Sequence, residues 1–295
     1  MRLPPYRTKE QYELMKSRSS RSSVIPDILS KKEVTYLYDW YKENKHREFR
    51  AGRAPVDGAG EKDAYNGKLK GNVRFPYAWE ELEHVLQPKV KEILGTNKFK
   101  FVSGRLYRVP NEHIWDSIHT DVCNNLAKLG TDLKHVYSKE QIEKIEREGA
   151  PANNGGKFHK WAKQYPEYIT IPWKTIVFPL WLDGPANTVM FDQYNYGAEN
   201  VSWNKQLHRT KHTGSIADST EYMTGKMSIT DEQYNKWLKH ITFPKDYLHG
   251  LSIQHVHEWK IGNAYIWDST QLHTSGYQPG ITDKIGLTIW TEYKE

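Results

Sequence analysis

The sequence predicts a mainly β protein with flanking helices, whose core is a double-stranded β-helix, or jelly roll. Three observations predict this class. Helical periodicity is confined largely to the first third of the chain, strand-like segments dominate the rest, and two long insertions interrupt those strands. The sequence contains neither a Rossmann glycine fingerprint nor a P-loop lysine motif, which argues against a nucleotide-binding α/β fold.

Two helices are expected before the strands. The segment after Ser30 repeats apolar and aromatic residues at helical spacing, and Ser30 with Glu33 forms a capping box. A second helix is expected over residues 77–94, because its apolar residues share one face and Gly95 provides a stop. We expect these helices, within residues 25–97, to buttress the sheet that follows.

The strand candidates are rich in β-branched and aromatic residues and are bounded by turn residues. They cover residues 98–109, 114–122, 175–182, 188–193, 251–259, 263–267 and 284–293. The Asp-Gly-Pro sequence at 183–185 predicts a turn between two of them. Many short strands of this kind, preceded by helices, favour a jelly roll with helices on one side.

The chain is expected to form one domain over residues 25–295, after a mobile leader over residues 1–24. The jelly roll is expected over residues 98–295, with insertions over 138–173 and 194–250. Long insertions in a compact β domain are commonly lids or binding loops. We therefore expect the insertion over 194–250 to form a lid over the functional site.

Composition limits the compartment and the partners. The single cysteine, Cys123, excludes an internal disulfide and a cysteine-rich metal cluster, and favours a reducing, cytoplasmic location. No apolar run is long enough to cross a membrane, so no membrane partner is expected. The net charge of +6 is compatible with an anionic partner, including a nucleic-acid base. The basic residues are dispersed, however, which argues against a dedicated nucleic-acid arm.

The triplet His119-Thr120-Asp121 is the first candidate metal-binding motif. On an extended segment, residues two apart point to the same side, so both side chains can reach one ion. Two histidines and one carboxylate on one face of an octahedron leave three open positions, as expected of non-haem Fe(II) sites. A third ligand must come from elsewhere. The chain has 13 histidines, so a chance pair without metal remains an open alternative at this point.

The C-terminal segment GNAYIWDSTQLHTSGYQPGITDKIGLTIWTEY places this triplet in a recognisable order. Here a strand ends in a turn, a histidine follows, and a basic residue opens the last strand. Together with IPDILSKKEVTYLYDW, LYRVPNEHIWDSIHTD and TVMFDQ, this order resembles the Fe(II)/2-oxoglutarate-dependent dioxygenases, particularly their prolyl-4-hydroxylase-like and phage-type members. The similarity extends from about Ile25 to the end, without the two insertions.

The resemblance implies a catalytic metal site. It makes His273 the third iron ligand, beside His119 and Asp121. It further implies 2-oxoglutarate as co-substrate, O2 as oxidant, and hydroxylation of an unidentified substrate with release of succinate and CO2. The carboxylate of Asp121 argues against the halogenase branch of the family, in which a small residue leaves room for chloride.

The resemblance also implies a site for the far carboxylate of 2-oxoglutarate. The basic residue at that position is Lys284, where many relatives have arginine. Because lysine offers one point charge instead of a fork, we expect a further donor, with Tyr107 and Thr288 as candidates. Ordinary packing is the alternative role for Tyr107 and Thr288, and an exposed strand lysine is the alternative for Lys284.

Two competing interpretations stay open at the level of sequence. His255-Val256-His257 resembles part of a cupin metal motif, although the expected glutamate is mis-spaced, because Glu258 follows directly. The second is a jelly-roll module that binds sugar or nucleic acid without any reaction, with tryptophan and tyrosine as stacking platforms. The substrate and the oligomeric state are not assigned by the sequence.

Overall fold

The computed structural model describes two sheets and the helices around them. The described residues are 9–44, 72–74, 77–110, 118–121, 171–194, 196, 202–203, 229–241, 245–248, 250–277 and 283–294. Among them, no helix is long and apolar enough to cross a membrane.

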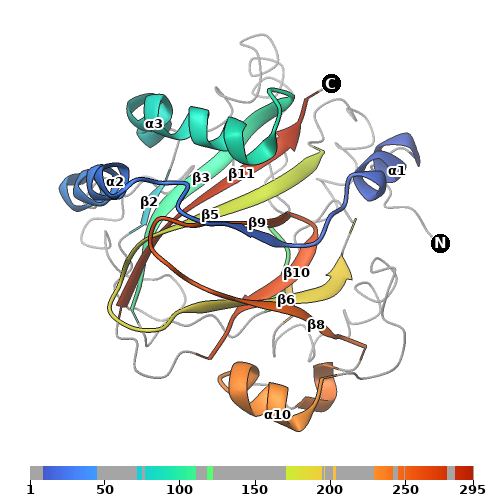
Figure 1. Ribbon diagram of the computed structural model, residues 1–295. Helices are drawn as coiled ribbons and strands as arrows, with labels where there is room; N and C mark the ends of the chain where they lie inside the picture. Colours follow the sequence, from blue (N-terminus) through green and yellow to red (C-terminus); the bar gives the residue numbers. More distant parts are fainter. Residues whose placement is uncertain are drawn as a thin grey trace, which may run out of the picture.

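Within the described residues, eleven strands form two antiparallel sheets (Figure 1). The strands are β1 (Ser23–Ile25), β2 (Asn72–Arg74), β3 (Phe99–Pro110), β4 (Ile118–His119), β5 (Pro172–Leu182), β6 (Asn187–Tyr194), β7 (Ser202–Trp203), β8 (Ile253–Glu258), β9 (Ala264–Asp268), β10 (Gln271–Ser275) and β11 (Asp283–Tyr293). The first sheet has six strands in the order β1-β9-β5-β11-β3-β2, and the second has five in the order β7-β4-β10-β6-β8. The predicted mainly β, jelly-roll class is confirmed.

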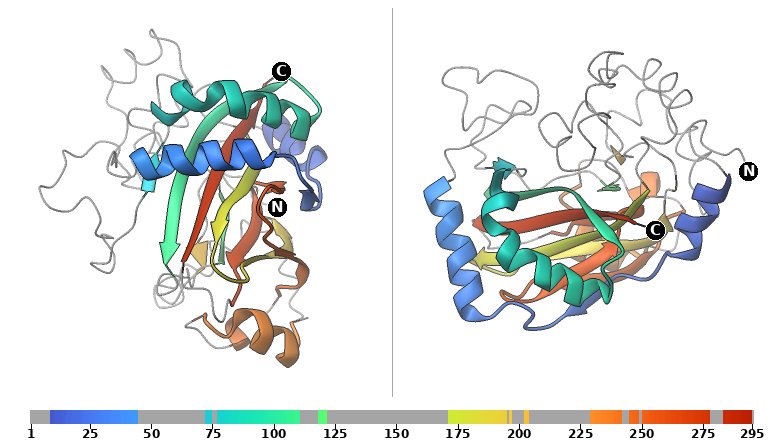
Figure 2. Two further views of the ribbon diagram at one scale, coloured as in Figure 1. Left: turned by 60° about the vertical axis from the view of Figure 1, so that its left-hand side comes forward. Right: turned by 90° about the horizontal axis from the view of Figure 1, so that it is seen from above.

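The helices lie outside the two sheets. They are α1 (Lys9–Ser17), α2 (Lys31–Asn44), α3 (Tyr77–Leu94) and α10 (Asp231–Gln233), which continues as the π-helical turn η4 (Tyr234–Leu238), and the 3-10 turn η5 (Lys245–Leu248). Figure 2 shows α2 and α3 crossing the outer side of the first sheet. Their ends follow the predicted signals: the amide of Ser30 donates to Glu33 at 2.7 Å, and Gly95 adopts a positive φ of 62°.

Strand β11 shows how the sheets divide apolar from polar residues. Ile285, Leu287 and Ile289 are buried in one apolar cluster with residues of α2 and α3. Because successive strand residues point to opposite faces, Lys284 and Thr288 lie on the other face, toward the second sheet. Both are almost completely buried. The face of β11 that is turned toward the second sheet therefore carries buried polar side chains.

The outer face of the second sheet is covered in the same way. Ile118, Val189 and Leu272 are buried there against Leu238 of η4 and Leu248 of η5. Each sheet thus has one face under helices and one face toward its partner sheet. The alternation directs the histidine-bearing positions of β4 and β10 inward.

The segment expected to be a mobile leader contains secondary structure. Tyr12 and Met15 of α1 are buried with Tyr196, which follows β6, and Ser23–Ile25 pairs with β9. Tyr12 and Met15 are three residues apart and so share one face of the helix. In a helix of nine residues, this pattern is too short to predict a helix from the sequence. Within the insertion over 194–250, residues 231–238 are helical, as α10 and η4. The residues expected to act as a lid lie largely outside the described ones.

The packing of α2 on the first sheet generates a stability prediction. Leu37 is completely buried, and Leu37→Ala should lower the free energy of unfolding by about 2–5 kcal/mol because it leaves a cavity. Thr35→Ala, at an exposed position of the same helix, should change it by less than about 0.5 kcal/mol. Urea denaturation measures both. Equal stability of the two variants would show that α2 is not part of the core.

Candidate metal centre

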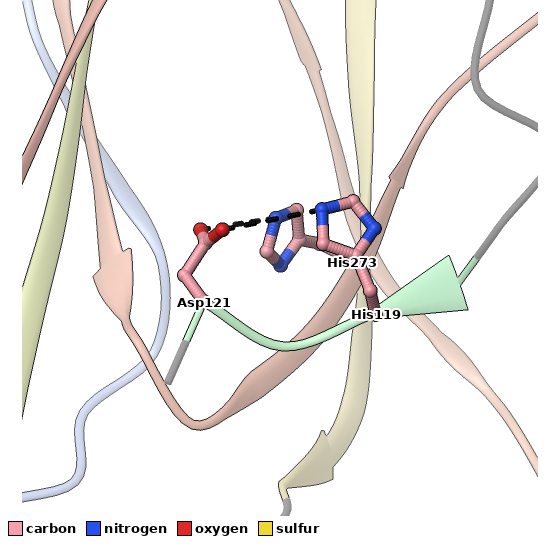
Figure 3. Close-up of side chains that lie close together, drawn as sticks. All are labelled: His119, Asp121 and His273. Atoms are coloured by element: carbon pink, nitrogen blue, oxygen red, sulfur yellow. Dashed lines mark ion pairs between the residues drawn. The ribbon is translucent and has the colours of Figure 1, made fainter. Parts of the chain in front are cut away.

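The pairing of β4 with β10 brings two histidine side chains next to each other (Figure 3). His119 and His273 are direct partners in this antiparallel pair. Side chains opposite each other in such a pair lie on the same face and close together. Their ring centroids are accordingly 4.4 Å apart. The structure thus joins two residues that are far apart in the sequence.

Asp121 completes the group from the end of β4. Its backbone amide donates to the carbonyl oxygen of Ser269 at 2.8 Å, which fastens it to the turn between β9 and β10. Its Oδ2 lies 3.2 Å from Nε2 of His273, and its Oδ1 lies 3.9 Å from Nε2 of His119. One potential ligand atom from each of the three residues therefore lies within 4.8 Å of the others.

His273 is held in one orientation. Its Nδ1 lies 3.0 Å from the carbonyl oxygen of Gln271, to which it donates, so that Nε2 faces Asp121. Burial of the ring disfavours its charged form, but the carboxylate of Asp121 and the hydrogen bonds outweigh burial and raise the pKa of His273. The electrostatic environment of this nitrogen therefore favours a cation.

Trp267 supports the carboxylate from β9. Its Nε1–H donates to Oδ2 of Asp121 at 3.2 Å, and its ring lies 4.9 Å from that of His273. Outer-shell donors of this kind orient metal ligands. Sequence reasoning missed Trp267, because only the contact between β9 and the end of β4 gives it a role.

The donor set fits a first-row divalent ion. Two imidazoles and one carboxylate from three chain positions leave further coordination sites open, which is the facial arrangement associated with non-haem Fe(II). Among the described residues, His119, Asp121 and His273 are the one group of three or more histidine, cysteine or acidic side chains with converging ligand atoms. The expected site residues are therefore brought together.

Lys284 lies on the same inner side of the first sheet. It is 2% exposed, and its Nζ lies 4.5 Å from the ring centroid of Trp259. It forms no ion pair with any described residue. Burial lowers the pKa of Lys284 to about 7, because its charge is removed from water without a compensating carboxylate. The alternative of an exposed strand lysine is excluded.

The two candidate donors lie near this lysine. Thr288 is buried four residues further along the same face of β11. Gly286 lies between Lys284 and Thr288, and a Cβ on it would come within 3.1 Å of the Oη of Tyr107. Tyr107 therefore packs over the strand between Lys284 and Thr288. Sequence reasoning found these residues but missed Trp259, the aromatic partner of Lys284.

One detail of β10 differs from expectation. As expected, a strand, β9, ends in a turn before His273. The residues after that turn, Gln271–Ser275, form a further strand that was not expected, with a register shift between Gln271 and His273 against β6. Five residues between two turns carry too weak a pattern to predict this strand.

The alternative motif does not assemble a comparable site. The rings of His255 and His257 lie 4.5 Å apart on β8, and Glu258 is exposed. Burial and the neighbouring His255 lower the pKa of His257 to about 4. Within the described part of the chain, no third histidine, cysteine or acidic ligand converges on this pair. A cupin-type set is therefore not found there.

Comparison with known proteins finds similarity to solved structures. No protein-family model matches the chain, and no curated protein matches it. Among solved structures, it is similar to the non-haem alpha ketoglutarate dependent epimerase SnoN from nogalamycin biosynthesis, at 10% identity over 97% of this chain and 85% of that chain, with a TM-score of 0.43. The carbocyclase SnoK from the same biosynthesis gives 13% identity over 98% and 87%, with a TM-score of 0.42.

A third similar structure is the viral collagen prolyl hydroxylase vCPH from Paramecium Bursaria Chlorella virus-1. It has 10% identity over 93% of this chain and 91% of that chain, with a TM-score of 0.39. SnoN has been solved in complex with Fe3+ and alpha ketoglutarate, and vCPH as a 2OG complex. These are similarities of fold, and the function proposed below rests on this chain's own residues.

The indole of Trp267 generates a test of the metal centre. Trp267→Phe keeps a ring against His273 but removes the hydrogen bond to Asp121, and should weaken Mn(II) binding about tenfold. Titration followed by calorimetry measures this affinity. The control is Trp173→Phe, because the ring of Trp173 packs edge-on against that of Tyr293, with centroids 5.3 Å apart, and the substitution keeps the backbone carbonyl that accepts from Ser269. An unchanged affinity in Trp267→Phe would rule out this supporting role.

Proposed function

We propose that this chain is an Fe(II)- and 2-oxoglutarate-dependent dioxygenase that hydroxylates a still unidentified substrate and releases succinate and CO2. One observation carries the proposal. A converging His119, Asp121 and His273 group and a buried lysine without an ion-pair partner, Lys284, both face the space between the two sheets. A metal on the triad and a dicarboxylate reaching the lysine would satisfy both sites together.

The triad would hold the metal through Nε2 of His273, a ring nitrogen of His119 and the carboxylate of Asp121. When bound, Fe(II) and 2-oxoglutarate supply the activation of O2 and the oxidation of the substrate. The chain contributes the orientation of its ligands. Gln271 fixes the ring of His273, and Trp267 fixes the carboxylate of Asp121.

Lys284 would bind the far carboxylate of 2-oxoglutarate. A buried ammonium without a carboxylate partner costs free energy, and a bound anion removes much of that cost. Thr288 and Tyr107 would supply the additional hydrogen-bond donors that a lysine, unlike an arginine, does not provide itself. The net charge of +6 favours an anionic substrate.

A spectroscopic experiment tests the proposal directly. Anaerobic addition of Fe(II) and 2-oxoglutarate to the wild-type protein should produce a visible charge-transfer band from the iron chelate. Asp121→Ala should abolish the band, because it removes the carboxylate ligand. His255→Ala is the matched control, since it removes an exposed histidine outside the triad and should leave the band intact.

The same experiment separates the proposal from a binding module without a reaction. A module that binds sugar or nucleic acid requires neither iron nor 2-oxoglutarate. Absence of the band in the wild-type protein, or an undiminished band in Asp121→Ala, would contradict the proposed function.

The lowered pKa of Lys284 predicts a pH dependence of co-substrate binding. A lysine with a pKa of about 7 is charged below that pH and neutral above it, and only the charged form pairs with a carboxylate. The Kd of 2-oxoglutarate for the Mn(II)-loaded protein should therefore rise above pH 7, by up to about tenfold per pH unit. Lys284→Arg stays charged and should abolish this slope. A pH-independent Kd in the wild-type protein would remove Lys284 from the binding site.

A further inference from the structure

Trp259 lies directly beside the proposed carboxylate site. It follows the last residue of β8, in the second sheet, and its side chain is 8% exposed. It is buried in one cluster with Val177 of the first sheet and Met190 of the second. The indole therefore occupies the space between the sheets, where Lys284 also lies.

The indole is fixed by contacts on several sides. Its Nε1–H donates to Oγ1 of Thr188 at 2.9 Å, and the backbone amide of Trp259 donates to the carbonyl oxygen of Ala186 at 2.7 Å. Its ring stacks on Tyr265, with centroids 6.4 Å apart and an interplanar angle of 24°. A side chain held by its polar atom, its backbone and its face has little freedom to turn away.

This fixed ring faces the lysine. Nζ of Lys284 lies 4.5 Å from the indole centroid, a distance at which a cation and an aromatic face attract each other. The attraction is strongest where water is excluded, as it is around this buried ammonium. The indole also lies next to Gly286, since a Cβ there would be in ordinary van der Waals contact with Cζ3 of Trp259, at 3.5 Å.

The indole is the charge-stabilising contact that the described residues provide for Lys284. No described carboxylate forms an ion pair with it. The titratable neighbour on β3 is the phenol of Tyr107, which lies against Gly286 between Lys284 and Thr288. On β8, His257 lies two residues before Trp259 on the same face, and its ring makes an edge-to-face contact with Tyr265. The ammonium is therefore positioned by an aromatic surface.

We propose that Trp259 is a positioning residue, whose indole face holds the Lys284 ammonium in place to bind the far carboxylate of 2-oxoglutarate. The inference rests on the proposed function and adds a determinant of specificity to it. An arginine positions itself by making two parallel hydrogen bonds to a carboxylate, whereas a lysine has a flexible stem and needs an external constraint. Trp259 supplies that constraint and so favours a dicarboxylic over a monocarboxylic keto acid.

The test compares two ligands in Mn(II)-loaded protein without O2. The first is 2-oxoglutarate, and the second is 2-oxovalerate, which has the same carbon chain without the far carboxylate. In Trp259→Leu the lysine can turn and water can enter, so the Kd of 2-oxoglutarate should rise about tenfold. The Kd of 2-oxovalerate should stay unchanged. Trp259→Phe keeps an aromatic face and should recover part of the selectivity.

The chain offers a matched control. The ring of Trp237 lies 4.6 Å from Nζ of Lys236 and packs against the cluster on the outer side of the second sheet. Trp237→Leu therefore removes the same kind of cation–ring pair away from the site, and should leave both affinities unchanged. Thr188→Val, which removes only the hydrogen bond to the Nε1–H, should lower the selectivity about two- to threefold. It tests the inference if Trp259→Leu fails to fold.

The outcomes are distinct. A selectivity ratio that stays at the wild-type value in Trp259→Leu, or in Thr188→Val if the former is unfolded, would overturn this inference and leave the proposed function standing. Equal weakening of both ligands would show a merely structural role and would overturn it too. A wild-type protein that binds Mn(II) but not 2-oxoglutarate would overturn the proposed function and this inference with it.

Discussion

The arrangement of this protein depends on one constraint, which is that the two faces of each central strand pack against different layers. One face of each sheet packs under helices, and the other faces the second sheet. In β11, Ile285 and Leu287 meet the helices while Lys284 and Thr288 point inward. In β4 and β10, Ile118 and Leu272 point outward while His119 and His273 meet between the sheets. The two larger apolar clusters thus lie under the helices, while the buried polar groups lie between the sheets beside a smaller apolar cluster.

The two buried lysines of the first sheet illustrate what that interior is for. Lys174 forms an ion pair with Asp268 and donates to Ser20 at 2.7 Å, so its charge is neutralised within the chain. Lys284 is equally buried but has an aromatic ring, Trp259, where Lys174 has a carboxylate. A buried unpaired cation is destabilising, and its presence is explained if a ligand supplies the anion. The buried charge of Lys284 therefore destabilises the free protein, and a bound anion would offset that destabilisation.

The sequence predicted those parts of the molecule that depend on local patterns. The capping box at Ser30, the end of α3 at Gly95 and the inward pairing of His119 with Asp121 all follow from residues a few positions apart. The place of His273 depended on a family resemblance, because no local pattern joins it to β4.

The residues that the sequence did not identify depend on contacts between distant strands. Trp267 has a role only because β9 meets the end of β4. Trp259 has one only because its ring, just after β8, reaches Lys284 of β11. One of many tryptophans cannot be singled out before these contacts are known. Helix α1 was missed for a similar reason, since Tyr12 and Met15 are recognisable as core residues only against Tyr196.

The most direct measurement is a crystal structure of the protein with Mn(II) and 2-oxoglutarate, grown without O2. We expect the metal to be bound by His119, Asp121 and His273, and the far carboxylate to lie within hydrogen-bond distance of Nζ of Lys284. Metal bound at other residues, or 2-oxoglutarate bound away from Lys284, would contradict the claim that the two inward-facing groups form one site.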